Sequence, residues 1–575
     1  MTDQNAQMSV AQAARSRSWP RPWPRSWSRP SPWAVGAVLI TALVLLPIVS
    51  VLWTAFHPTE NIWPHLLATT LPRYLANSVI LAVGAGLLAG AVGTGAAWLV
   101  TMFRFPGSRI LEWLLLLPLA IPAYIGAYGL VDFLQYSGPV QSELRHLMGW
   151  ASARDYWFPD IRSRWAAVLV LSGALYPYVY MLARAAFREQ AGGVYEVARA
   201  LGAGPWRMFW QVGLPLARPA IAAGIAIVMM ETLNDYGVVA YFAVQTLTMG
   251  IFSVWLEAGN AGGAAQISCL ILGAVLVLAL AERAGRSRSR FYATARQRRP
   301  VTPRHLPRGA GLIAMGLCLL PFLFGFVFPV AVMAAHALSR PSGWVAPDLL
   351  RALRNTLVVG GSASILTVAA AIFMVYGLRL TGSRAMRYLF PIASIGYAAP
   401  GAVLAVGLLI PLAAVDHRIA DLIQDLTGRD PGLLLTGSAA ALVLAFAVRF
   451  FALAQGAVDS AFGRISPSLP MAARSLGQGE GGTLVRVYLP LMRGSIGTAL
   501  LLVFVDSMKE LPATLLLRPF NFETLATRVQ EKASLENLAD AAPAALVIIA
   551  VGIVAVALLA RSTLGSGDRP PRKPI

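Results

Sequence analysis

Charged residues, lysine, cysteine and histidine are all scarce in this chain. Only 13% of its 575 residues are charged, whereas an average soluble domain has about 25%. Its three lysines are Lys509, Lys532 and Lys573, and none follows a glycine, so the Gly-Lys-Ser/Thr phosphate loop of an ATPase is absent. Two cysteines and six scattered histidines form no metal-ligand pattern and no Ser-His-Asp order. We therefore expect no catalytic residue and no cofactor bound by this chain, and we assign no metal site.

Long apolar stretches take the place of these residues, and 57% of the chain is hydrophobic. A helix needs about 20 apolar residues to cross a bilayer, because lipid offers the backbone no hydrogen-bond partner. Twelve stretches meet this length, and Pro122, Pro391 and Pro400 are positions where a helix could kink. Ten of the twelve carry no charge and two do, and we predict an all-α membrane protein of twelve spans. The uncharged stretches are residues 33–55, 78–102, 113–131, 165–183, 258–281, 309–338, 357–378, 388–415, 431–448 and 541–560, and the charged ones are 219–241 and 494–517.

The net charge of +20 comes mainly from arginines that lie beside the apolar stretches. They gather before the first stretch and after the sixth, which the positive-inside rule places on the cytoplasmic side of a membrane. Residues 416–430, on the opposite side by this count, contain four aspartates. We therefore expect a multi-pass membrane protein with both termini in the cytoplasm. A nucleic-acid partner is not expected, because no loop carries the dense basic stripe that phosphate binding requires.

An internal repeat relates the two parts of the chain. The sequence EVARALGAG from Glu196 resembles MAARSLGQG from Met471, 275 residues later, and the same offset relates Leu214-Pro215 to Leu489-Pro490. Transporters often consist of two such repeats with the substrate route at their interface. The predicted organisation is a basic N-terminal segment (1–32), a first six-span half (33–282), a basic linker (283–308), a second half (309–561) and a tail (562–575).

The repeated segment has the composition of a helix-turn-helix. Residues 196–201 favour a helix, Gly202 and Gly204 favour a turn, and Pro205 suits the first turn of a second helix. We expect Leu214-Pro215 to end that second helix before the next span. Ala198 would let another surface approach closely, and Arg199 could make directed polar contacts.

The pattern Glu-x-Ala-x-x-x-Gly followed by Val-x-Leu-Pro resembles the "EAA" loop of ABC importer permeases. This resemblance implies the type I ABC importer permease fold, with two fused halves. It implies that each loop is a coupling helix seated in one of two separate ATPase subunits, which bind ATP and Mg. In the second copy Met471 replaces the usual glutamate, so we expect the two ATPase contacts to differ in chemistry. The residues assigned to the loops are Glu196, Ala198, Arg199, Gly202, Leu214, Pro215, Met471, Ala473, Arg474, Gly477, Leu489 and Pro490.

The two charged spans carry their acidic residues at equivalent positions of the repeat. Glu231 and Asp235 correspond to Asp506 and Glu510, and each pair has the i,i+4 spacing that places both side chains on one helix face. Charges inside a membrane usually face a bundle interior or an aqueous path. These four, with Tyr236 and Lys509, are our candidates for the translocation path, and four carboxylates against one lysine would favour a cation. The alternative is structural: Asp506 and Lys509 could neutralise each other, and all these groups could sit in an outer aqueous mouth.

Two further segments resemble the fused ferric iron permeases. They are ETLNDYG from Glu231 and KELPATLLLRP from Lys509, followed by NFETLATR from Asn521. The resemblance implies ferric iron as substrate and a periplasmic iron-binding protein as partner. Fused permeases for thiamine, and related ones for polyamines or phosphonates, are alternatives of the same layout. A secondary transporter driven by an ion gradient would explain the duplication and the buried carboxylates, but not two coupling loops.

Overall fold

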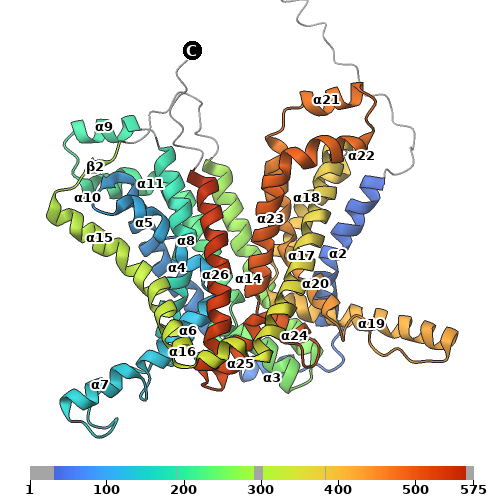
Figure 1. Cartoon of the computed structure of the whole chain (residues 1–575), viewed down its shortest axis with the longest axis horizontal. Coiled ribbons are helices and arrows are strands. Elements are labelled where there is room, and N and C mark those ends of the chain that lie inside the picture. The colour runs from blue at the N-terminus through green and yellow to red at the C-terminus, as the bar shows by residue number, and fades with distance from the viewer. Residues whose placement is uncertain (1–31, 191, 290–301, 382–383, 565–575) are drawn as a thin grey trace, which may run out of the picture.

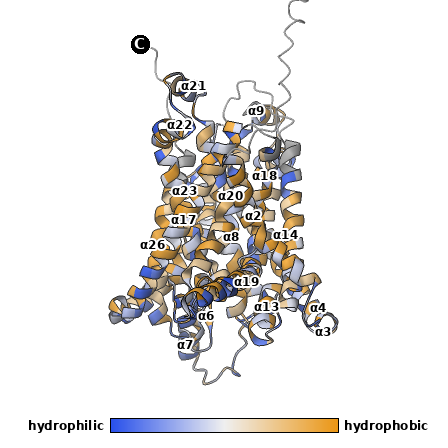
Figure 2. Ribbon diagram, turned by 90° about the vertical axis from the view of Figure 1, so that its right-hand side faces the viewer, coloured by the Kyte–Doolittle hydropathy of each residue, from blue (hydrophilic) through white to orange (hydrophobic). Residues whose placement is uncertain are grey.

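The computed structural model describes residues 32–190, 192–289, 302–381 and 384–564. These residues form a bundle of long helices, and the short helices α9 and α21 lie at the same end of the bundle on opposite flanks (Figure 1). Figure 2 shows hydrophobic residues along the long helices and hydrophilic ones gathered towards the two ends. The arginine-rich N-terminal segment, the middle of the predicted linker and the end of the tail lie outside the described residues.

The first half and the linker that follows it consist of helices, short 3-10 and π-helical turns and two short strands, β1 in the half and β2 in the linker. Their elements are α2 (Pro32–Phe56), α3 (Trp63–Ala68), α4 (Leu71–Met102), β1 (Phe103–Arg104), α5 (Ser108–Leu114), η1 (Leu117–Ala120), α6 (Ala123–Leu134), α7 (Pro139–Met148), α8 (Arg164–Glu189), α9 (Gly192–Ala200), α10 (Pro205–Met208), η2 (Phe209–Gly213), α11 (Leu214–Asn234), α12 (Gly237–Tyr241), α13 (Leu247–Phe252), η3 (Ser253–Glu257), α14 (Ala261–Ser289) and β2 (Arg304–His305).

The second half repeats this order. Its elements are α15 (Arg308–Phe322), η5 (Leu323–Val327), α16 (Phe328–Ser339), η6 (Pro341–Val345), α17 (Pro347–Thr381), α18 (Arg384–Ala393), η7 (Ser394–Ala398), α19 (Gly401–Thr427), α20 (Ala439–Gly463), α21 (Ser468–Ser475), α22 (Glu480–Thr483), η8 (Leu484–Tyr488), α23 (Leu489–Lys509), α24 (Pro512–Leu517), α25 (Leu525–Ser534) and α26 (Leu538–Leu564).

The predicted all-α membrane architecture is confirmed. Among the described residues, eleven helices are long and apolar enough to cross a bilayer, or twelve if the bent pair Ser108–Ala120 and Ala123–Met148 counts as one span. Two of the three prolines lie at breaks: Pro122 directly precedes α6 and Pro400 directly precedes α19. Pro391 lies inside α18.

The tenth predicted span, residues 431–448, was wrong in position. The helix found there is α20, which begins at Ala439, continues to Gly463 and contains Arg449 and Asp459. Counting uncharged residues ended the span just before Arg449. A helix can carry this arginine inside the bundle because the side chain has an acidic partner there.

The first helix of each half packs against the other half. Helix α2 contacts α17, α18 and α19 of the second half, whereas α15 and α16 contact α4, α5 and α6 of the first. Strand β1 also pairs in parallel with β2, so the end of the predicted linker is held against the first half. The two halves therefore interlock, and a cavity between them is enclosed by both.

The expectation that Leu214-Pro215 would end a separate helix was wrong. Helix α10 runs through a π-helical turn into α11, so that residues from Pro205 to Asn234 form one span. The same π turn precedes Leu489-Pro490 in the second half. A proline inside an α-helix lacks one N–H and collides with the carbonyl four residues before it, and a wider π turn relieves both constraints without ending the helix.

Candidate functional site

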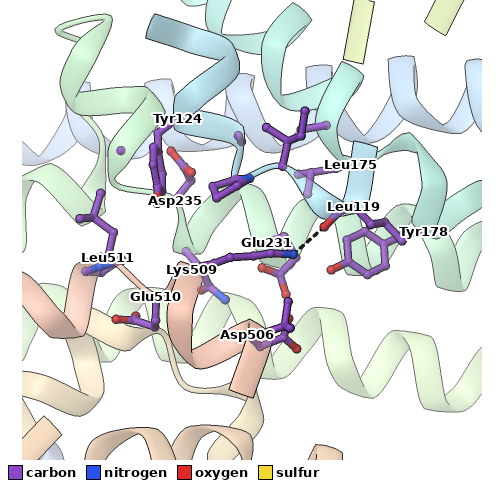
Figure 3. Close-up of a pocket in the computed structure, with 18 of the residues that line it drawn as sticks. Leu119, Tyr124, Leu175, Tyr178, Glu231, Asp235, Asp506, Lys509, Glu510 and Leu511 are labelled. Atoms are coloured by element: carbon purple, nitrogen blue, oxygen red, sulfur yellow. Dashed lines mark hydrogen bonds between the residues drawn. The ribbon is translucent and has the colours of Figure 1, made fainter. Parts of the chain in front are cut away.

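A cavity of about 370 Å³ lies between the two halves (Figure 3). Its walls come from α8 and α11 of the first half, from α20, α23 and α26 of the second, and from the chain around η1 and α6. All six residues predicted for the translocation path line this single cavity: Glu231, Asp235, Tyr236, Asp506, Lys509 and Glu510. Figure 3 labels the acidic and basic ones among them.

Interrupted helices create the polar character of the cavity. Helix α11 ends at Asn234 and the chain resumes as α12 at Gly237, and α23 ends at Lys509 before α24 begins at Pro512. Such breaks leave backbone N–H and C=O groups without helical partners at membrane depth, where lipid cannot satisfy them. Broken helices of this kind occur where a transporter handles its cargo.

Asp235 and Glu510 use their carboxylates to cap the helices that follow these breaks. Asp235 accepts a hydrogen bond of 2.8 Å from the backbone N–H of Val238. Glu510 accepts bonds of 3.0 Å from the N–H of Ala513 and 3.2 Å from that of Thr514. A carboxylate stabilises a helix N-terminus through these N–H groups and the helix dipole. This pair therefore has a structural function at the cavity wall.

Arg449 was missed by the sequence analysis and adds a second cation to the cavity. Its Nη1 lies 3.3 Å from Oε1 of Glu510, and both side chains are largely buried. The backbone of Gly401 passes directly beside this ion pair, where a Cβ atom would collide with both side chains. An isolated arginine in an otherwise apolar stretch was the available signal. The expected ratio of four carboxylates to one cation is therefore four to two.

Glu231 and Asp506 remain the unpaired carboxylates of the cavity. Neither has a hydrogen-bond or ion-pair partner among the residues that the structure describes, and the two lie close to each other on the wall (Figure 3). The hydroxyl of Tyr124 and Oδ1 of Asn234 are also buried without a partner in the described part of the chain. The cavity thus presents oxygen atoms whose bonding capacity is not used by the protein.

Lys509 and Tyr236 each contact a neighbour outside the set of six predicted residues. The Lys509 ammonium donates a 2.6 Å hydrogen bond to the carbonyl of Leu119. Its charge also acts on Asp506, three residues away on the same helix, as the structural alternative expected. The ring of Tyr236 stacks on Phe252 with 3.9 Å between the ring centroids.

The two predicted coupling loops have the same backbone geometry. Gly202 and Gly477 adopt left-handed φ angles of 80° and 82°. In the first loop the N–H of Ala203 bonds to the carbonyl of Ala198, and in the second the N–H of Gln478 bonds to that of Ala473, each at 3.0 Å. This is the Schellman arrangement, in which a glycine ends a helix because other residues are strained at that angle.

The loops expose similar apolar surfaces at one end of the bundle (Figure 1). Leu201 and its counterpart Leu476 are 80% and 81% exposed. Glu196 and Met471 are both exposed, while Ala198 is half-buried and Ala473 is buried. The predicted difference in chemistry between the two loops therefore lies on an accessible surface.

Comparisons with known proteins extend these observations. Residues 65–290 match the family "Binding-protein-dependent transport system inner membrane component". A ferric iron transport system permease of Haemophilus influenzae is 24% identical over 92% of this chain and 98% of its own length. The sulfate transport system permease of Escherichia coli is 27% identical over 35% of this chain and 71% of its own. A chain in the crystal structure of a bacterial alginate ABC transporter overlays 45% of this chain and 95% of its own, with 17% identity and a TM-score of 0.36.

The family match covers the first half, and the 275-residue repeat relates the second half to it. The relative from Haemophilus influenzae aligns across both halves. Residues 65–290 therefore match an inner membrane component of binding-protein-dependent transport, and the chain as a whole is similar to a transport system permease along both of its repeated halves.

Proposed function

We propose that this permease carries ferric iron from a periplasmic binding protein into the cytoplasm. The observation that carries the proposal is the cavity between the halves, whose two unpaired carboxylates, Glu231 and Asp506, face each other. Hard cations prefer oxygen ligands. The similarity to a ferric iron permease along both halves supports the same cargo.

The charge of the cavity favours a cation over an oxyanion such as sulfate. Arg449 is paired with Glu510, and Lys509 donates to a backbone carbonyl. The unpaired groups are therefore acidic, and an anion would be repelled by them at a depth where screening by water is weak. Among the described residues no group of three or more His, Cys, Asp or Glu could hold a metal ion. Two carboxylates make a weak contact, which suits a cargo that must also leave.

The driving force in this proposal comes from two separate ATPase subunits, each with ATP and Mg, seated on the two coupling loops. The matching Schellman turns and the exposed Leu201 and Leu476 support equivalent contacts. The end of the bundle that carries α9 and α21 would then face the cytoplasm, and the end that carries α7 would face the binding protein (Figure 1). Both termini would lie on the cytoplasmic side.

The proposal can be tested in proteoliposomes that contain the permease, its ATPase and its binding protein. Iron uptake should require ATP, and Glu231→Gln with Asp506→Asn should lower it about tenfold or more without lowering the yield of assembled complex. Arg418→Gln, on the exposed part of α19, is the matched control.

Transport of thiamine, a polyamine or a phosphonate in place of iron would overturn the assignment of the cargo. Iron uptake without any ATPase would overturn the proposed energy source and favour a gradient-driven transporter. Unchanged uptake by the double variant would remove the two carboxylates from the route.

A further inference from the structure

A single hydrogen bond crosses from one half to the other beside the acidic pair. Lys509, at the end of α23, extends its side chain along the cavity, and its ammonium lies 2.6 Å from the carbonyl oxygen of Leu119 in η1 (Figure 3). The two residues are 390 positions apart in the chain. Because one lies in each half, the bond fixes the distance between the halves at the depth of the cavity.

The carbonyl of Leu119 needs this donor because of a proline. In the 3-10 turn η1, the partner of Leu119 would be the N–H of the residue three positions later, and that residue is Pro122. Proline has no N–H, so the carbonyl is left without its helical partner. An unsatisfied carbonyl is costly at membrane depth, and the Lys509 ammonium supplies the missing donor.

Among the described residues, no equivalent side chain of the first half makes this contact with the second half. The repeat places Asn234 where Lys509 stands, and the Asn234 side chain is too short to extend as far. Its Oδ1 is buried without a partner in the described part of the chain. The halves are therefore joined at the cavity by a charged side chain from the second half.

The position of the ammonium also affects the unpaired carboxylates. Lys509 is three residues from Asp506 on the same helix, and its charge acts on that carboxylate. A cation at this place partly neutralises Asp506, one of the two acidic residues, electrostatically and without a hydrogen bond to it. It occupies the region in which a cationic cargo would meet the two carboxylates.

We propose that Lys509 is a positioning residue of the transport cycle, which holds the two halves together across the cavity and stands in for the cargo cation until the halves separate. While the bond to Leu119 is intact, the route is closed and the ATPases are idle. When the halves move apart, the bond breaks and the carboxylates become available. The function of Lys509 as a stand-in for the cargo cation rests on the proposed transport of a cation, whereas its function as a link between the halves does not.

The first test measures ATP hydrolysis by the complete permease–ATPase complex in lipid nanodiscs without binding protein. Lys509→Met keeps the length of the side chain but removes the charge and the donors. We expect it to raise this idle rate about tenfold, the change that corresponds to losing one charge-assisted hydrogen bond. Lys509→Arg keeps a cationic donor and should restore a rate near that of the unchanged protein. Lys532→Met, in α25 away from the cavity, is the matched control.

A second variant removes the link without changing Lys509. Pro122→Ala restores a backbone N–H three residues after Leu119, which can take the carbonyl and displace the ammonium. The idle rate should again rise, with iron uptake measured separately. Spin labels at Leu201→Cys and Leu476→Cys, with Cys269 and Cys318 replaced by serine, should report a changed distance between the loops in both variants.

The proposal is overturned if Lys509→Met assembles normally yet keeps both the idle rate and the loop distance of the unchanged protein. It is also overturned if Lys509→Arg behaves as Lys509→Met does, since a donor would then be irrelevant. If Lys509→Met raises the idle rate but the complex with the unchanged permease moves no iron, the result would support the link between the halves and contradict the ferric proposal instead.

Discussion

The two halves of this protein have nearly the same backbone and different charges around the cavity. Helices α11 and α23 coincide in register at the 275-residue offset, and both are interrupted at the same place by a capping carboxylate, Asp235 or Glu510. The second half places Arg449 beside its carboxylate Glu510, whereas the equivalent position of the first half is Ala174. The duplicated fold therefore builds the site, and residues that differ between the copies set its charge.

The same contrast appears at the end of the bundle that carries the loops. In the first half Glu112 is buried and accepts hydrogen bonds from Arg184 at 2.9 Å and Arg188 at 3.0 Å. The repeat replaces Arg184 with Asp459, which pairs at 2.9 Å with Arg379 in a far more exposed position. The charge at the position of Arg184 is reversed and the burial of the pair is lost, so the two pairs should differ strongly in energy.

The largest expected effect comes from removing the acidic member of each of these two ion pairs. Glu112→Ala leaves Arg184 buried without its acidic partner and should destabilise the protein by about 3–5 kcal/mol. Asp459→Ala removes an exposed pair and should cost at most about 1 kcal/mol. Both losses of stability can be measured by thermal unfolding in detergent, with the remaining fraction of monodisperse protein as the readout. Equal losses of stability would show that burial does not distinguish the two sites.

A smaller effect is expected from adding one carbon beside the Arg449–Glu510 pair. Gly401→Ala places a Cβ against both side chains, so the pair must move, and overpacking of this kind costs about 1–3 kcal/mol. At Gly126, the same offset in the first half, the Cβ of an alanine would lie 3.5 Å from Val170, an ordinary contact that should change little. Thermal unfolding and iron uptake should both decrease for Gly401→Ala alone. A similar decrease for Gly126→Ala would contradict the difference between the halves.

The two predicted coupling loops should lose a similar amount of stability when an equivalent glycine is replaced in each, in contrast to the two sites above. Gly202→Ala and Gly477→Ala each place a side chain in a left-handed conformation, at a cost of about 1–2 kcal/mol. No atom lies within 4 Å of either new Cβ, so the cost is backbone strain alone. Hydrogen exchange of α9 and α21 should accelerate to a similar extent. Gly204→Ala is the control because its φ is −70°, and a loop that responds in one half only would refute the equivalence.

The smallest expected effect concerns a contact present at the second loop. The indole Nε1 of Trp33 donates a 2.8 Å hydrogen bond to Oε2 of Glu480, whereas the repeat places Pro205 at the corresponding position of the first loop. Glu480→Ala should cost about 0.5–1.5 kcal/mol, seen as a small decrease in the unfolding temperature. Pro205→Ala removes no side-chain hydrogen bond and serves as the comparison. A decrease of the same size in both variants would mean that the Trp33 contact contributes nothing.

The sequence by itself determined the class of the protein, the register of its repeat and six of the residues that line the cavity. Apolar length identifies membrane helices because lipid leaves the backbone no other way to satisfy its hydrogen bonds. The offset that relates Glu196 to Met471 also relates Glu231 to Asp506, and the structure brings the second pair together at one wall. Homologous helices that line a shared interface must place equivalent positions there.

Only the tertiary structure decided how those residues divide their functions. Asp235 and Glu510 cap helices, and Glu231 and Asp506 stay unpaired. Arg449 enters the cavity from α20, a helix that the predicted span ended just before this arginine. The exchange of first helices between the halves, and the bond from Lys509 to Leu119, were equally invisible. Hydropathy and spacing report what one segment prefers, whereas each of these contacts joins segments distant in the chain, and their geometry depends on how the two halves pack.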